Sequence, residues 1–366
     1  TLRLIKQSTG DEIDLKKLTY DDPKVYELIS KGDTLGVFQL ESTGMRGFMQ
    51  NLQPSCLEDI IAGISLYRPG PMQYIDTYVV NKKNPLQTKY LCPALEPILN
   101  VTYGCMVYQE QVLQILRELA GFSLAESDIV RRAMSKKKHA EMVKYREIFV
   151  NGDEQKDISG CVKNGIDSEV ANKIYDEMMD FASYAFNKSH AAAYAIIAYQ
   201  TAYLKTYYPT QFLSALLSSV IGVDDKIVKY IRQLKEKDIK LLSPDVNDSS
   251  ERFSVVDGNV RYGLVAIKGL GENAVKEIIS IREQKGRFTD FGDFADKMEF
   301  KYLNKRGVEN LIKCGAFDSL GHKRRELTEV FSDYIDSVMK QRKQLGEGQI
   351  SMLELVGGED ASAIKA

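Results

Sequence analysis

A strongly basic stretch at residues 131–146 is the feature that most restricts how this chain can fold. It carries seven Arg or Lys side chains and a single acid, Glu141, in a chain of 366 residues whose formal net charge is −2. Such a local excess of positive charge is tolerated at a surface, above all where a polyanion is the partner. We therefore expect this stretch to be either a solvated helix face or a binding site for phosphate groups.

Helical patterns flank the basic stretch on both sides. Ser123 and Glu126 have the S-x-x-E spacing of a capping box and begin a helix whose apolar residues recur every three or four positions. A second amphipathic helix is predicted from Met142. The junction of the two helices would present five cations: Arg131, Arg132, Lys136, Lys137 and Lys138. Cations gathered in this way can hold several phosphate oxygens, so the pattern predicts a phosphate or nucleic-acid site.

A second candidate anion site lies at residues 186–194. Asn187 or Ser189 is predicted to cap a helix that continues to the Tyr-Pro pair near residue 208. The free amides of a helix start, joined by the side chains of Lys188 and His190, would attract an anion. The alternative, in which His190 is merely a capping histidine, fits the sequence equally well.

Arg68 is a third candidate. It precedes a Pro-Gly-Pro sequence, which forces a rigid, non-helical turn and holds Arg68 at the mouth of a fixed loop. This pattern is compatible with a structural corner as much as with a binding site.

The composition is that of an ordinary globular chain, with 44% hydrophobic and 27% charged residues. No apolar run approaches the roughly 18 residues of a membrane span, so we expect no membrane partner. Five scattered cysteines without a C-x-x-C pattern favour reduced thiols in a cytoplasmic protein. The three histidines are not paired at ligand spacing, and we expect no metal site. Because the chain begins with Thr1, we expect it to be part of a larger polypeptide.

The pattern changes near residues 239–246, where we place a domain boundary. An Asp257-Gly258 turn between two apolar runs predicts a β-hairpin. Residues 264–279 then resemble a helix-hairpin-helix motif: an apolar segment, a Gly-x-Gly turn and a helix with an apolar face. Lys268, Gly269 and Gly271 would let backbone amides approach a phosphate without reading bases. A fainter copy is expected at residues 303–317, and a plain two-helix turn is the alternative.

The C-terminal part reads as a charged helix at residues 321–343 followed by a polar linker. Within the linker, residues 349–353 form an isolated amphipathic peptide that resembles a sliding-clamp binding peptide. Gln349, Met352 and Leu353 would lie in a hydrophobic pocket of the clamp.

Five segments, in this order, resemble the alpha subunit of bacterial DNA polymerase III, the C-family of replicative polymerases. They are residues 36–42, 68–71, 103–111, 131–138 and 186–193. The resemblance implies a mostly α fold with multi-domain helical fingers, a small β-hairpin and a tandem helix-hairpin-helix. It implies fingers at residues 1–245, with residues 1–30 as the junction to the palm. It places the hairpin and the tandem motif at residues 246–320, and the charged helix with its clamp-binding linker at residues 321–366.

The resemblance also implies partners: primer-template DNA, an incoming dNTP, the β sliding clamp and other subunits of the replicase holoenzyme. The cations at residues 131–138 would contact the triphosphate or nearby backbone, with Lys188, His190 and Arg68 as further candidates. The Mg²⁺ ligands of the family lie in the palm, whose catalytic aspartates have no counterpart here. We therefore expect a piece of a DNA-directed DNA polymerase that is inactive alone. The alternatives are a non-catalytic DNA- and clamp-binding module, or the error-prone paralogue of the same family.

Overall fold

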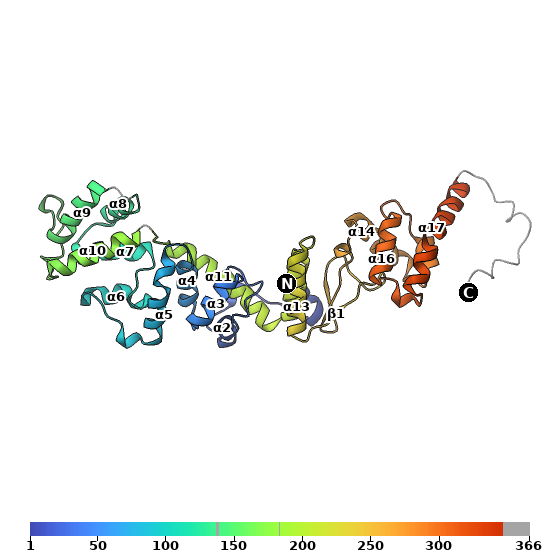
Figure 1. The fold of residues 1–366 in the computed structure, drawn as a ribbon, viewed down its shortest axis with the longest axis horizontal. Helices are drawn as coiled ribbons and strands as arrows, with labels where there is room; N and C mark the ends of the chain where they lie inside the picture. Colours follow the sequence, from blue (N-terminus) through green and yellow to red (C-terminus); the bar gives the residue numbers. More distant parts are fainter. Residues whose placement is uncertain (137–138, 183, 347–366) are drawn as a thin grey trace, which may run out of the picture. The chain divides into compact units, whose positions relative to one another are not determined.

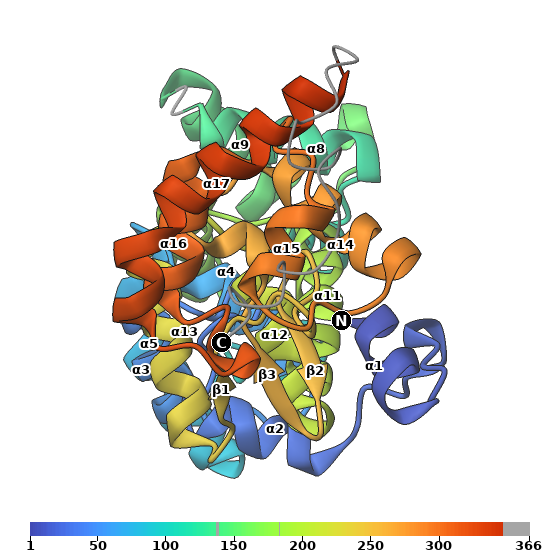
Figure 2. The same cartoon turned by 90° about the vertical axis from the view of Figure 1, so that its right-hand side faces the viewer.

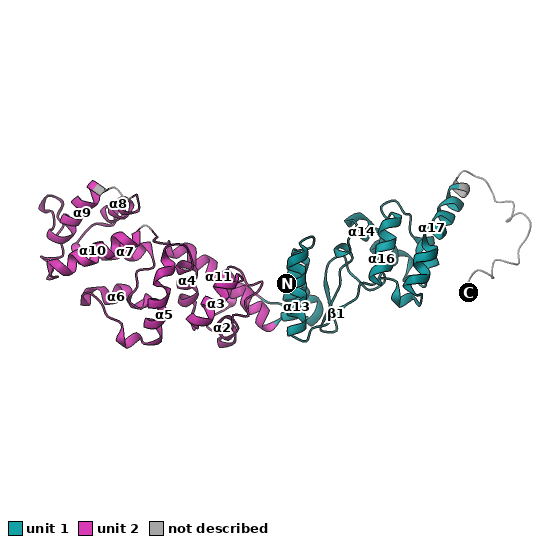
Figure 3. Ribbon diagram, in the orientation of Figure 1, with its two compact units in different colours: residues 1–13, 208–366 teal, residues 14–207 magenta. Residues whose placement is uncertain are grey.

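The structure is a computed structural model that describes residues 1–136, 139–182 and 184–346. It is mostly α-helical with one small sheet, which confirms the fold class expected from the sequence (Figure 1). The chain forms two compact units, residues 14–207 and residues 1–13 with 208–366 (Figure 3). This division by contacts falls at residue 208, and the functional division expected near residue 245 stays a prediction.

The unit of residues 14–207 contains two helical cores. One core is formed by α2 (Pro23–Ser30), α3 (Thr43–Leu52), α4 (Leu57–Leu66), α5 (Ile75–Lys83) and α11 (Lys188–Tyr207). The other core is formed by α6 (Glu96–Leu99), α7 (Gln109–Ala120), α8 (Leu124–Ser135), α9 (His139–Asn151) and α10 (Ser168–Ala182). Short 3-10 turns connect them at Leu15–Lys17, Pro71–Tyr74, Pro85–Gln87, Pro93–Leu95, Asn100–Thr102 and Glu154–Lys156.

Small side chains allow α11 to pack closely against α4. Four alanines of α11 have no exposed surface: Ala191, Ala195, Ala198 and Ala202. The local signals behave as expected. The side chains of Ser123 and Glu126 bond to each other's backbone amides and begin α8, and α7 ends at Gly121, whose φ is 82°. The helices that carry the candidate sites are thus fixed by caps and by apolar packing.

The other unit begins with α1 (Leu2–Thr9), α12 (Pro209–Ser219) and α13 (Asp224–Glu236). A three-stranded sheet follows, in the order β1 (Leu241–Leu242), β3 (Asn259–Arg261), β2 (Ser254–Val256), as Figure 2 shows. Asp257 (φ 48°) and Gly258 (φ 73°) form the turn between β2 and β3. Positive φ at both residues is typical of a two-residue hairpin, so the predicted D-G hairpin is confirmed.

The rest of this unit shares one apolar core. Its helices are α14 (Glu272–Lys285), α15 (Phe291–Lys297), α16 (Lys305–Cys314) and α17 (Arg324–Gly346), with 3-10 turns at Leu264–Ala266 and Asp318–Leu320. The apolar segment before the Gly-x-Gly turn is therefore a single 3-10 turn rather than an α-helix. The expected fainter copy corresponds to α16, which packs along α17 (Figures 1 and 2).

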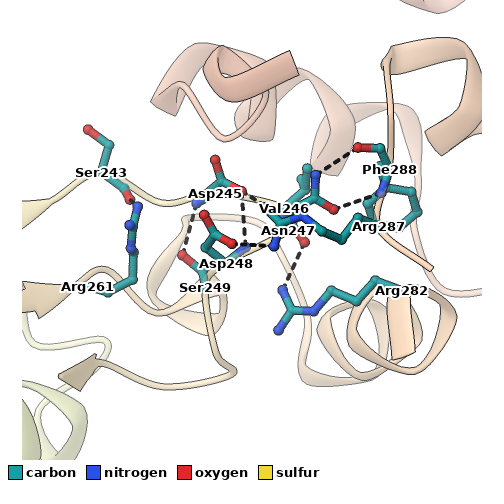
Figure 4. A network of polar contacts seen from close by, with 10 residues as sticks. All are labelled: Ser243, Asp245, Val246, Asn247, Asp248, Ser249, Arg261, Arg282, Arg287 and Phe288. Carbon is teal, nitrogen blue, oxygen red and sulfur yellow. Dashed lines mark hydrogen bonds and ion pairs between the residues drawn. The ribbon is translucent and has the colours of Figure 1, made fainter. Parts of the chain in front are cut away.

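A polar network fixes the irregular segment at residues 243–249 against this core (Figure 4). The buried amide of Asn247 bonds twice to the backbone of Phe288: its Nδ2 donates to the carbonyl at 2.8 Å, and its Oδ1 accepts from the amide at 2.8 Å. Arg282 donates to the carbonyl of Val246 at 2.9 Å. Because these buried backbone groups have no strand or helix partner, the side chains satisfy them and hold the segment in place.

Candidate nucleic-acid interface

The junction of α8 and α9 carries the basic stretch, and one acid of α8 holds two of its three arginines. Asp128 Oδ1 accepts from Nε and Nη2 of Arg131 at 3.0 and 2.7 Å, and Asp128 Oδ2 lies 2.8 Å from Nε of Arg132. The hydrogen bond from Arg131 is the main reason why the pKa of Asp128 is below its usual value. Sequence reasoning missed Asp128 because it lies just before the basic stretch, although its helical spacing to Arg131 and Arg132 predicts both pairs.

The cations of the junction differ in how open they are. The Arg131 side chain is only 17% exposed, whereas that of Arg132 is 66% exposed. Lys136, at the end of α8, is also exposed. Lys137 and Lys138 lie outside the described residues. Arg146 turns away, since it pairs with Asp176 of α10 and stacks on a tyrosine ring, so the junction presents chiefly Arg132 and Lys136.

A second group of side chains gathers around the ring of Phe186; we call Arg68, Phe186 and His190 the Phe186 cluster. The Arg68 guanidinium carbon lies 3.9 Å from the centre of the Phe186 ring. Arg68 donates to the carbonyls of Ser65 at 3.1 Å and Tyr184 at 3.0 Å. Burial lowers the pKa of Arg68. These contacts hold Arg68 in a structural corner. They also place it on the ring that His190 contacts.

His190 completes the cluster, and Lys188 lies next to it in the sequence, at the start of α11. The His190 ring is exposed and lies 5.4 Å from the Phe186 ring, centre to centre. Lys188 Nζ lies 3.0 Å from Oε2 of Glu58 and 5.3 Å from the centre of the Tyr108 ring. Arg68, after the end of α4, and His190, at the start of α11, therefore meet at the Phe186 ring, whereas the Lys188 side chain pairs with Glu58 in the first turn of α4.

A carboxylate of the protein already occupies the start of α11. Both Oε atoms of Glu110, from α7, accept from the Lys188 amide, at 3.2 and 3.1 Å. Glu110 also accepts from Nδ2 of Asn187 at 3.0 Å, while Asn187 Oδ1 caps the helix by accepting from the His190 amide at 2.9 Å. Of the two predicted caps, Asn187 is the one used. A phosphate bound at this helix start would have to displace Glu110.

The junction and the Phe186 cluster belong to the same compact unit, and one contact connects their elements. Ser135, at the end of α8, donates to the carbonyl of Ala182, the last residue of α10, at 3.0 Å. The chain leads from Ala182 to Phe186, where the backbone pairs with Tyr108 in an isolated bridge. The end of α8 is thus bonded to the end of α10, and the chain after α10 continues to the cluster.

The helix-hairpin-helix site lies in the other unit, at the start of α14. Gly269 has φ +80°, and a Cβ on it would lie 2.9 Å from Nδ2 of Asn310. Gly271 is the N-cap of α14, and no described side chain caps that helix start. A Cβ on Gly271 would meet no described atom within 4 Å. With Lys268 exposed beside them, these open amides have the geometry that a phosphate oxygen requires.

The described residues contain neither a candidate metal site nor a membrane-spanning helix. No group of three or more His, Cys, Asp or Glu side chains there is placed to hold a metal ion. Of the helices in the same ranges, none combines the length and the apolar character needed to cross a membrane. The peptide with Gln349, Met352 and Leu353 lies outside the described residues.

The fold and the uncapped start of α14 are those of a helical protein with a helix-hairpin-helix region. The family model of the helix-hairpin-helix motif matches residues 238–327, and that of the bacterial DNA polymerase III alpha subunit finger domain matches residues 1–157. The chain is similar to "DNA polymerase III subunit alpha" of Thermus aquaticus, 45% identical over 90% of this chain and 27% of the relative. The protein of the same name from Saccharopolyspora erythraea is 43% identical over 98% of this chain and 30% of the relative.

The chain belongs to the family of bacterial DNA polymerase III alpha subunits. The relative from Pasteurella multocida agrees, at 42% identity over 93% of this chain and 29% of its own length. The chain thus spans less than a third of the length of these curated relatives.

Proposed function

We propose that this chain provides the fingers, the duplex grip and the clamp attachment of a DNA-directed DNA polymerase. The proposal rests chiefly on one observation: a match to the finger domain is followed, in the same chain, by a match to the helix-hairpin-helix motif. The chain spans less than a third of the length of the relatives, so the activity is proposed for a longer protein.

In this proposal the cations of the junction meet the triphosphate of an incoming dNTP. Arg132 and Lys136 are exposed and point to this role, and Lys137 and Lys138 are assigned to it with them. Positive charge held in place at the pyrophosphate stabilises the charge that develops there as the nucleotide is transferred. Arg131, whose guanidinium is paired with Asp128, would contribute less charge to the ligand.

The Phe186 cluster, together with Lys188, is the second nucleotide- or template-facing group. Lys188, His190 and Arg68 would add contacts to phosphate or to the template strand. The open amides of Gly271 and its neighbours, with Lys268 and Gly269, would hold the backbone of the primer-template duplex upstream. Gln349, Met352 and Leu353 would attach the chain to the β sliding clamp, and the replicase holoenzyme would supply the remaining subunits.

Mg²⁺ would supply the in-line alignment of the attacking and leaving oxygens in the complete protein. The described residues of this chain offer no carboxylate group that fits two such ions. We therefore assign the metal to a part of the longer protein outside these residues, and we expect this chain alone not to extend a primer.

A second function fits the isolated chain: a non-catalytic module that binds duplex DNA and the clamp. It is favoured by the acids at the candidate nucleotide site, where Asp128, Glu58 and Glu110 neutralise groups that a triphosphate would need. Binding assays separate the two. The fingers function predicts that the chain binds a dNTP, and the module function predicts that it binds only duplex DNA.

The direct test of the fingers function uses the full-length polymerase with Arg132→Glu. Reversing an exposed charge at the triphosphate should lower kcat/KM for the dNTP at least about tenfold, equivalent to about 1.4 kcal/mol of transition-state binding. The matched control is Lys163→Glu, which reverses an exposed charge in a loop of the same unit. Equal kinetics in the two variants, with thermal unfolding unchanged, would contradict the assignment of the junction.

A further inference from the structure

The helix-hairpin-helix region contains two copies of one pattern, residues 268–279 and residues 301–312. Positions that are buried in the first copy are buried at the same spacing in the second: Leu270 and Leu303, Ala274 and Gly307, Val275 and Val308, Ile278 and Leu311. The N-caps correspond as well, Gly271 for α14 and Asn304 for α16. The helices α14 and α16 therefore share one buried pattern, so their exposed positions can be compared one by one. The hairpins before them differ, since positive φ falls at Gly269 in the first and at Phe300 in the second.

Each copy holds the hairpin of the other. Asn310, on α16, donates from Nδ2 to the carbonyl of Lys268 at 2.6 Å. Glu277, on α14, accepts from the amide of Glu299 at 3.0 Å. Glu277 and Asn310 occupy the same position of the repeated pattern. Each bonds to backbone that precedes the other helix, although Glu299 lies two positions earlier in the repeat than Lys268. Both hairpins are thus fixed to one body.

The second hairpin has lost the features by which the first exposes amides. Tyr302 and Asn304 stand where the first copy has Gly269 and Gly271. Asn304 Oδ1 accepts from the amide of Gly307 at 2.9 Å, which closes the start of α16 to a phosphate oxygen. The first turn of α16 carries no acid, whereas that of α14 carries Glu272.

Cations replace the lost amides. Lys301, Lys305 and Arg306 all lie on the second hairpin or in the first turn of α16. Lys305 is engaged, since its Nζ lies 2.6 Å from Asp336 of α17. Lys301 and Arg306 are exposed and form no ion pair with any residue of the described ranges. A hydrogen bond with Tyr302 raises the pKa of Lys301, and Nζ of Lys301 lies 5.1 Å from the centre of the Tyr302 ring.

We propose that Lys301 and Arg306 form a second contact to the DNA backbone, based on charge, beside the amide-based contact at Lys268 and Gly271. This inference rests on the proposed duplex binding and assigns it two further residues. Two flexible cations contact phosphates without reading bases, so the second hairpin adds affinity and salt dependence rather than sequence specificity. The two copies would then grip the same duplex by different chemistry.

The salt dependence of binding distinguishes the two kinds of contact. For the 366-residue chain on a labelled primer-template duplex, log Kd is measured against log salt concentration. Each cation that neutralises a phosphate contributes about 0.9 to the slope. Lys301→Ala with Arg306→Ala should therefore lower the slope by about 1.8. The control Lys313→Ala removes a cation from the same helix that is already paired with Glu309, and it should leave the slope unchanged.

The chain itself suggests the variant that tests the first hairpin. Gly271→Asn places a capping side chain where the second copy has Asn304, and the added atoms meet open space. It should weaken binding severalfold while the slope stays as in the unaltered chain. A slope that is unchanged in Lys301→Ala with Arg306→Ala, or equally reduced in Lys313→Ala, would overturn the inference. If the unaltered chain bound no duplex at low salt, the proposed duplex grip would itself be wrong, and the inference with it.

Discussion

The two regions that carry the candidate sites treat their positive charges in opposite ways. In the unit of residues 14–207, acids of the protein hold the cations and the helix start: Asp128 holds Arg131 and Arg132, and Glu110 occupies the first amides of α11. In the helix-hairpin-helix region, Lys268 and the amides at Gly271 are open. A ligand of the first region must compete with a built-in carboxylate, whereas a ligand of the second meets free donors.

This difference has a physical meaning for what each region can bind. Competition with a carboxylate lowers the affinity for any single phosphate and favours a ligand that brings several at once. Open donors on a rigid hairpin bind any phosphate backbone that reaches them. The comparison thus favours a selective site in the first region and a general grip in the second.

The largest effect is expected on the stability of the second region. Asn247→Ala removes both hydrogen bonds to the buried backbone of Phe288. Leaving these groups unpaired should lower the free energy of unfolding by about 1–3 kcal/mol. Urea unfolding of the variant measures this, with Asn273→Ala, an exposed residue of α14, as the control. If the two variants were equally stable, the network would not hold the region.

Asp128→Asn tests the competition at the junction. Without this carboxylate, Arg131 and Arg132 keep their charge and lose their internal counter-charge, which should tighten binding of inorganic triphosphate about fivefold at low salt. Calorimetric titration gives the affinity. Glu169→Gln removes an acid from the same unit at the exposed start of α10 and controls for net charge. An equal gain in both variants would mean that Asp128 does not guard a site.

Glu110→Gln applies the same test to the start of α11. The neutral amide leaves the Lys188 amide accessible to a stronger anion, so triphosphate binding should improve about threefold. The effect is smaller than at Asp128 because Glu110 bonds to neutral amides, whereas Asp128 neutralises two arginines. The same titration measures it, and Glu118→Gln, on an exposed part of α7, serves as control. Weaker triphosphate binding in Glu110→Gln would show that no anion uses this helix start.

The smallest effect is expected at Asp248, an acid of the second unit that lies away from the hairpins. Its hydrogen bond with Arg287 lowers the pKa of Asp248 in the folded state. The stabilisation is therefore present above the unfolded-state pKa and is lost as the pH falls through the folded-state pKa. Because the pair is exposed and screened, Asp248→Asn should cost a few tenths of a kcal/mol at neutral pH and nothing in acid. A difference that grew on acidification would contradict this sign.

Local patterns in the sequence predicted much of this fold. The capping box at Ser123 and the hairpin at Asp257 and Gly258 depend on residues a few positions apart, and both are confirmed. The partners of the candidate residues depend on tertiary packing. Glu110 and Lys188 are separated by 78 positions, and no local periodicity brings them together.

The sequence thus predicted the basic residues of the candidate site, but not the acids that neutralise them. The local sequence predicted Arg68, Lys188 and His190 as candidates. It gave no separate signal for Phe186, whose ring contacts Arg68 and His190. Asp128 has helical spacing to Arg131 and Arg132, but it precedes the basic stretch and so was not among the predicted residues.

Hydrogen exchange of the chain with a primer-template and a dNTP tests the central contrast most directly. The account predicts that duplex alone protects the amides at the start of α14, near Gly271. Protection at the start of α11, near Lys188, should require the dNTP as well, because displacing Glu110 takes a ligand that brings several phosphate charges to one point, as a triphosphate does. Protection at the start of α11 by duplex alone, or none at α14, would contradict the account.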